Sequence, residues 1–262
     1  MVDRLDRMTT HDVRARLAQG NGVVVLPLGA TEQHGPHCPL GTDTFCAEMV
    51  AEQVASELDA CLAPALPYGD STPHLNFPGS ITLTPTTLTL VVKELCLGFA
   101  NSGFTFVVIL NGNNPNLPAI LAGAREAQLL KPIAIAVSSY WDALRETYTE
   151  LVPPSDPHMS LRSFNGHGGI METSLSMAYA EESVQMDRVI TGPVEHALLI
   201  ADPTLAYVTR FEDYSRSGVL GDASCASAEL GQRIAQMAGR TIAERARLLQ
   251  ETFAIPTPTG HS

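Results

Sequence analysis

The sequence has little positive charge and no long hydrophobic run. Its 262 residues include 16 Lys and Arg against 28 Asp and Glu, which gives a formal net charge of -12. Because phosphate backbones are bound mainly through Lys and Arg, we expect no nucleic acid partner. No apolar stretch is long and uninterrupted enough to span a bilayer, and residues 1–7 lack the apolar segment of a signal peptide. These absences predict a cytoplasmic protein without a membrane partner.

Cysteines are scattered along the chain and show no pairing pattern. There are five of them, and they form neither CxxC pairs nor the dense spacing of a disulfide scaffold. Most are expected to be small buried hydrophobic residues. Cys38 lies in the loop discussed below, but no basic partner is evidently fixed beside its thiol, so it is left out of the catalytic set. A serine hydrolase is also disfavoured, because the chain has no Gly-x-Ser-x-Gly motif.

Short apolar runs alternate with stretches of helical periodicity along the first half of the chain. The runs lack the alternation of a half-exposed strand, which is typical of strands covered on both faces of a parallel sheet. We therefore predict a mainly parallel α/β sheet with crossover helices, in one domain spanning residues 1–262. The expected strands are 23–28, 61–66, 104–110 and 132–137, and the expected helices are 10–19, 44–58, 86–101 and 117–130.

A loop rich in glycine and proline follows the first expected strand and contains Glu32, His34 and Asp43. Carboxylate and imidazole side chains are common metal ligands, and glycine and proline bend and stiffen the loop that brings them together. Polar loops after strands are also ordinary features of α/β proteins. That reading explains the asparagines at 111–116 well, but it explains the Glu-x-His pair with Asp43 poorly. The pattern predicts a metal site.

Polar clusters follow three of the expected strands, at residues 32–34, 68–74 and 111–116. The carboxyl ends of parallel strands share one edge of a sheet, which is where ligands gather in such folds. We therefore expect these three loops to converge. The segments 68–74 and Tyr140–Trp141 are candidate walls for a small polar substrate, although Trp141 would serve equally well in the core.

The second half is less regular, with prolines that predict an extended surface loop at 151–164 and a long helix expected at 224–249. Between them, His167 precedes two glycines and Glu172 begins an apolar helix. A carboxylate in a first helical turn sometimes only complements the helix dipole, worth about 0.3–1 kcal/mol. A histidine in a glycine turn sometimes only caps it. The presence of His167 and Glu172 close together in sequence favours a functional role for both residues.

These motifs, taken in order, resemble those of the creatininase (creatinine amidohydrolase) family. The resemblance implies a three-layer α/β/α sandwich and a homo-oligomer such as a hexamer or trimer of dimers. It also implies a site with one or two divalent ions, Zn or alternatively Mn or Fe, that hydrolyses compact amides. By the same resemblance, the metal ligands are Glu32, His34, Asp43 as the bridge, and Glu172, and the catalytic histidine is His167. The matching segments are 26–37 with Asp43, 68–69 with His74, 77–81, 111–112, 167–169 with 172–174, and 218–222.

One position departs from the family pattern. Members normally carry Asn-Gly-His after the third strand, and that histidine binds metal, whereas this chain has Asn113. In creatininase itself a glutamate follows two residues later, where this chain has Pro115. A carboxamide is a poorer ligand than an imidazole for transition metals. Two outcomes remain open: a mononuclear site held by His34, Asp43 and Glu172, or a degenerate site. For His37 and His74 we favour hydrogen bonding over compensating ligation.

The expected reaction is hydrolysis of a C–N bond, amide or cyclic amide, in a small polar molecule. A metal-bound hydroxide would attack the carbonyl, and His167 would protonate the departing nitrogen as general acid. The alternatives are a catalytically degenerate paralogue that binds a ligand, and a relative that hydrolyses a carbocyclic ketone or a short peptide. The sequence does not identify the substrate.

Overall fold

The computed structural model describes residues 2–151, 164–193 and 208–253. Its centre is a five-stranded sheet in the order β1-β3-β2-β4-β5, and every pairing is parallel. The predicted parallel α/β sheet is therefore confirmed. The strands are β1 (Asp3–Arg4), β2 (Val23–Leu28), β3 (Cys61–Leu62), β4 (Phe106–Asn111) and β5 (Ala134–Ser139).

The two central strands, β2 and β4, are apolar at almost every position and buried on both faces. This burial explains their unbroken hydrophobic sequences, because helices cover the sheet on each side. The strands pair in register from Val23 with Phe106 to Leu28 with Asn111. Their carboxyl ends therefore stop side by side, and the loops that follow begin as neighbours.

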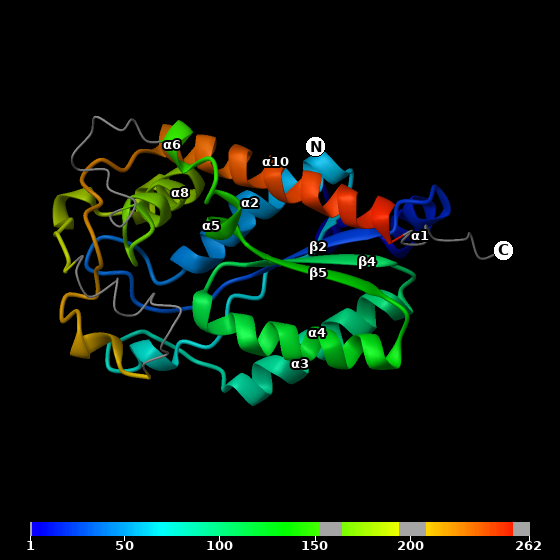
Figure 1. Cartoon of the computed structure of the whole chain (residues 1–262), viewed down its shortest axis with the longest axis horizontal. Coiled ribbons are helices and arrows are strands. Elements are labelled where there is room, and N and C mark those ends of the chain that lie inside the picture. Colours follow the sequence, from blue (N-terminus) through cyan, green and yellow to red (C-terminus); the bar gives the residue numbers. More distant parts are fainter. Residues whose placement is uncertain (1, 152–163, 194–207, 254–262) are drawn as a thin grey trace.

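Helices cover both faces of the sheet, which gives the expected three layers (Figure 1). One face is covered by α3 (Pro85–Asn101) and α4 (Leu117–Leu130), and the other by α2 (Thr42–Leu58), α8 (Ile170–Ala180) and α10 (Ala228–Thr252). A separate hydrophobic core lies between the sheet and each helical layer. A further helix, α1 (Thr10–Ala18), precedes β2, and its Thr9 and Asp12 form a capping box.

The second expected strand is much shorter than the predicted range 61–66, because only Cys61–Leu62 form β3. Pro64 and Pro67 have no backbone N–H to donate, so the ladder is interrupted after Leu62. An isolated bridge between Leu28 and Leu66 continues the pairing. The sequence also gave no sign of β1. The extended loop expected at 151–164 falls almost entirely outside the described residues.

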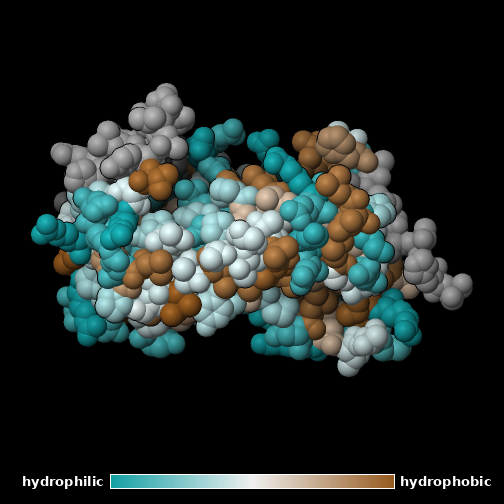
Figure 2. Space-filling model, turned by 90° about the horizontal axis from the view of Figure 1, so that it is seen from below, coloured by the Kyte–Doolittle hydropathy of each residue, from teal (hydrophilic) through white to brown (hydrophobic). Residues whose placement is uncertain are grey.

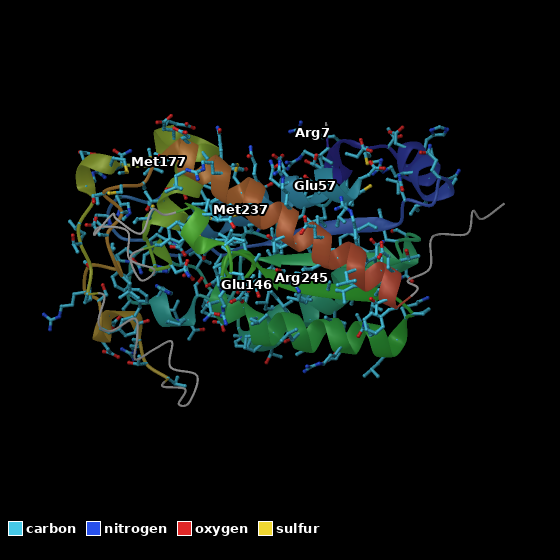
Figure 3. All side chains as sticks on the ribbon, turned by 45° about the horizontal axis from the view of Figure 1, so that its top comes forward. Arg7, Glu57, Glu146, Met177, Met237 and Arg245 are labelled. Atoms are coloured by element: carbon cyan, nitrogen blue, oxygen red, sulfur yellow. The ribbon has the colours of Figure 1, made fainter. Side chains whose placement is uncertain are left out.

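The long helix α10 begins at Ala228, four residues later than expected, where Ser227 caps it by accepting a bond from the Leu230 amide. It packs on α8 and α2, and Arg245 of α10 pairs with Glu146 (Figure 3). Both side chains of that pair are largely exposed, so the pair contributes little to stability.

The surface is mixed rather than uniformly polar. On the side covered by α3 and α4, apolar side chains lie among polar ones (Figure 2). These two helices contribute the exposed leucines Leu90, Leu129 and Leu130. None of the described helices combines the length and hydrophobicity needed to cross a membrane.

Candidate functional site

Three elements bring carboxylates and an imidazole together beyond the carboxyl end of β2. The loop after β2 provides Glu32 and His34, the first turn of α2 provides Asp43, and the first turn of α8 provides Glu172. Glu32, His34 and Asp43 are buried, and Glu172 is partly exposed. The three loops predicted to converge do so, since Glu32, His74 and Asn113 line one cavity, to which the distant helix α8 adds Glu172.

A close approach of backbone to backbone makes this arrangement possible. Gly112 follows β4 and lies against the start of α2, where an added Cβ would sit 2.3 Å from the carbonyl oxygen of Asp43. No side chain fits in that space. The glycine therefore lets the loop after β4 lie directly beside the turn that bears Asp43.

His34, Asp43 and Glu172 form a compact set whose potential ligand atoms all lie within 4.8 Å of one another. The Nε2 atom of His34 is 3.0 Å from Oδ1 of Asp43 and 3.6 Å from Oε2 of Glu172. Within the described part of the chain, however, neither His34 Nε2 nor Asp43 Oδ2 makes a hydrogen bond of acceptable geometry. Buried polar atoms rarely lack a partner, so these two atoms fit a cation between them.

The protonation behaviour of this set also fits a cation. Burial lowers the pKa of His34, but the carboxylates of Asp43 and Glu172 outweigh that effect and raise it to about 10. Burial raises the pKa of Glu172 to about 7, although His34 opposes the shift. Burial likewise raises the pKa of Asp43. The metal-free site thus retains protons that a divalent ion would displace.

Glu32 lies beside this set but has different partners. Its Oε2 accepts a hydrogen bond from Nδ2 of Asn113 at 3.3 Å, and its Oε1 is 3.2 Å from Nε2 of His74. Burial raises the pKa of Glu32 well above its usual value, and the nearby Asp43 adds to the shift. The position where the sequence lacked the expected imidazole is therefore occupied by an amide that donates to Glu32.

His167 lies in the turn before α8, with its ring stacked between those of His34 and His74 at centroid distances of 4.1 and 4.6 Å. Its Nε2 is 2.6 Å from the carbonyl oxygen of Gln33. The same Nε2 lies 3.1 Å from Nε2 of Gln33, but the closer contact with the carbonyl places the proton on Nε2, since two lone pairs would otherwise face each other there. Burial, reinforced by His34, lowers the pKa of His167 well below its usual value. The ring is thus neutral, and Nδ1 holds the free lone pair.

Gln33 contacts the rings of His74 and His167, although the sequence did not indicate it as a site residue. Its Oε1 accepts from the Gly35 amide at 2.9 Å, and its Nε2 lies 2.9 Å from Nδ1 of His74. Gly218, whose φ is +77°, leaves the room that the Gln33 side chain needs. A glycine almost two hundred residues away in sequence carries no local signal of this contact.

Other candidate residues take structural positions. His37 lies within hydrogen-bond distance of the Gly168 carbonyl and Thr173, which agrees with a hydrogen-bonding role. Burial raises the pKa of Cys38 to about 12, so its thiol is not a nucleophile at neutral pH. The interpretation of Tyr140 as a pocket wall is wrong, because its side chain is fully buried in the core.

A cavity of about 690 Å³ opens over the site. Glu32, Asp43 and Glu172 line it, and Trp141 and Phe211 are among its aromatic residues. This volume suits a small ligand. The expected wall segment 68–74 contributes Pro73 and His74 to the lining, whereas Tyr68 is half exposed and does not line the cavity.

The model of the family described as creatinine amidohydrolase matches residues 6–246. The chain belongs to the creatininase family. Creatinine amidohydrolase of Pseudomonas putida is 30% identical over 251 residues, which cover 92% of this chain and 94% of that protein. The mycofactocin precursor peptide peptidase of Mycolicibacterium smegmatis is 30% identical over 224 residues, covering 81% and 79%. A solved structure described as creatininase Mn superposes with a TM-score of 0.81 at 28% identity, covering 97% of this chain and 99% of that one.

This creatininase-family chain thus has relatives named as hydrolases, and the predicted three-layer fold is confirmed. Its individual site residues stay predictions: Glu32, His34, Asp43 and Glu172 as ligands, and His167 as the catalytic histidine. The geometry separates the four predicted ligands into two groups. His34, Asp43 and Glu172 are grouped around unpaired atoms, whereas Glu32 is paired with its own donors.

Proposed function

We propose that this protein is a metal-dependent hydrolase that cleaves an amide or cyclic amide bond in a small polar molecule. The observation that carries the proposal is the buried pair of unsatisfied atoms, His34 Nε2 and Asp43 Oδ2, facing Glu172. Three protein ligands with an open position are typical of catalytic zinc sites, and a set with two carboxylates also suits Mn. When bound there, the ion supplies a Lewis acid that activates water and polarises a carbonyl.

The protein residues supply the proton transfer. His167 is neutral, with its Nε2 proton committed to the Gln33 carbonyl, so its Nδ1 accepts the proton of the attacking water. It then returns this proton to the departing nitrogen. His167 therefore acts first as a general base and then as a general acid, whereas only the general acid was expected from the sequence. Leaving-group protonation matters because an amide nitrogen is expelled poorly as an anion.

The cavity supports a compact substrate with both polar and apolar surface. Its volume of about 690 Å³ is in the range of small-molecule sites. Trp141 and Phe211 offer apolar walls, and Asn114 and Arg145 offer polar groups near the mouth. The substrate class that fits this lining is small amides, lactams and formamides.

The test is a turnover screen with a metal-free control. The protein is stripped with chelator, reloaded with Zn²⁺ or Mn²⁺, and incubated with creatinine, lactams, N-formyl amines and short peptides, with products followed by mass spectrometry. Glu172→Gln should abolish turnover because it removes a ligand. Glu94→Gln, the same change on an exposed position of α3, should leave it unchanged.

The outcomes separate the two candidate functions. Turnover that needs metal and is lost only in Glu172→Gln supports the hydrolase. Stoichiometric metal without turnover of any compound favours a ligand-binding paralogue, for which the pairing of Asn113 with Glu32 is the motivating observation. Failure to bind any divalent ion overturns the proposal. The expected homo-oligomer and cytoplasmic location stay predictions.

A further inference from the structure

We infer that each subunit binds one metal ion, between His34, Asp43 and Glu172, and that Asn113 and His74 keep Glu32 out of the metal's coordination. The inference rests on the proposed function for metal dependence and adds the number of ions and the ligand set. A two-ion site would require Glu32 as a ligand, together with further donors beside it. The hydrogen bonds around Glu32 argue against both requirements.

Both oxygens of Glu32 already face donors. Asn113 Nδ2 is 3.3 Å from Oε2, and the same nitrogen is 3.0 Å from the Asp70 carbonyl oxygen. Because both partners are acceptors, the atom between them is the amide nitrogen and not its oxygen. An N–H group cannot coordinate a cation. Asn113 therefore occupies the position from which a histidine would coordinate a second ion, but it presents an N–H group there instead of a lone pair.

The other donor to Glu32 is His74, and its tautomer follows from its neighbours. The Gly35 amide donates to Oε1 of Gln33, which fixes the Gln33 amide with Nε2 toward His74. Gln33 then donates to Nδ1 of His74, so that nitrogen holds a lone pair. Because a histidine ring always carries at least one N–H and Nδ1 accepts from Gln33, the proton of His74 is on Nε2. The Nε2–H group of His74 thus faces Oε1 of Glu32, at an N···O distance of 3.2 Å.

A donor nitrogen has no lone pair for a metal, so His74 does not replace the missing histidine. His167, which lies within 4.8 Å of Glu32 and His34, offers no alternative through Nε2, because that atom donates to the Gln33 carbonyl at 2.6 Å. A second ion would then have at most two protein ligands, Glu32 and the unpaired Oδ2 of a bridging Asp43. Structural and catalytic metal sites normally use three or more protein ligands.

The set around His34 has the opposite character. Here two buried atoms lack hydrogen-bond partners, and the carboxylates of Asp43 and Glu172 both face the imidazole of His34. The charge of one divalent ion would balance Asp43 and Glu172 when His34 is neutral. Glu32, already satisfied by two N–H donors, lies beside this ion as a neighbour that receives hydrogen bonds.

Metal content per subunit tests the inference. Metal-free protein is dialysed to equilibrium against Zn²⁺ or Mn²⁺, and the ions are counted by mass spectrometry, with circular dichroism as the folding check. Wild type and Glu32→Gln should each hold about one ion, whereas Glu172→Gln should hold far less. Loss of the ion in Glu32→Gln, with the fold intact, would make Glu32 a ligand and overturn the inference.

A gain-of-site variant gives a second, independent readout. Asn113→His removes the donor to Glu32 and adds an imidazole, so it should raise the content to about two ions. Asn114→His, an exposed neighbour, should stay at one. A folded Asn113→His protein that still holds one ion would contradict the role given to Asn113. Two ions in wild type would overturn this inference while leaving the hydrolase intact, and none would overturn the metal-dependent function itself.

Discussion

Replacing Gly218 by alanine should destabilise the protein and disturb the site from a distance. Gly218 has φ +77°, a conformation that costs an alanine about 1–2 kcal/mol. Its new Cβ would also lie 1.8 Å from Oε1 of Gln33, so a packed side chain would have to shift. Such overpacking costs about 1–3 kcal/mol. The free energy of unfolding should therefore fall by about 2–5 kcal/mol.

Gly98→Ala is the matched control, because the same change meets no atom within 4 Å there. Gly98 lies inside α3, where alanine is preferred to glycine by about 0.5–1 kcal/mol, so this variant should be slightly more stable than wild type. In a chain of this size each kcal/mol moves the Tm by about 2–4 °C. Thermal melts of the metal-free proteins measure both effects.

The two variants should also differ in function. Gly218→Ala moves Gln33, which holds His74 and His167, so turnover should fall with stability. Gly98→Ala should leave turnover unchanged. Equal melting temperatures for the two variants would refute the contact between Gly218 and Gln33.

Three further predictions concern the site itself. His167→Asn should keep its metal and lose turnover by about 10²- to 10⁴-fold, whereas a loss of metal would show that His167 is a ligand. Native protein should react with a thiol reagent at Cys225 alone, since the other four cysteines are buried, and Cys38→Ser should stay active; rapid labelling of Cys38 would contradict this. Burial raises the pKa of Glu172 to about 7, above its ordinary value of 4.5, so its stabilising contribution to the metal-free protein is lost as pH rises through about 7. The rise in Tm on adding Zn²⁺ should therefore grow between about pH 6 and pH 8, because fewer protons compete with the ion, and a constant rise would count against Glu172 as a ligand.

The sequence predicted those parts of the fold that depend on local pattern. The unbroken apolar runs of β2 and β4 indicated a covered parallel sheet, and the loop from Glu32 to Asp43 indicated a metal site. Both signals are local. A strand buried on both faces has a continuous apolar sequence, and the candidate ligands of the loop lie within a few residues of one another. The alternation of strands and helices then placed three polar loops at one edge.

What the sequence did not predict depends on contacts between distant segments. Gln33 appeared only as a residue between Glu32 and His34, yet it fixes the orientation of two histidines through hydrogen bonds to His74 and His167. The pairing of Asn113 with Glu32 spans 81 positions and has no local pattern. The length of β3 was overestimated because the prediction gave more weight to the apolar residues of this segment than to the prolines that shorten the strand.

Anomalous diffraction from a crystal soaked in Zn²⁺ or Mn²⁺ tests the central claim most directly. The account predicts one anomalous peak per subunit, with His34 Nε2 and carboxylate oxygens of Asp43 and Glu172 at about 2.0–2.2 Å from the ion. Glu32 should remain bonded to Asn113 and His74 in the same map. A peak coordinated by Glu32, a second peak beside it, or no peak between His34, Asp43 and Glu172 would contradict the account.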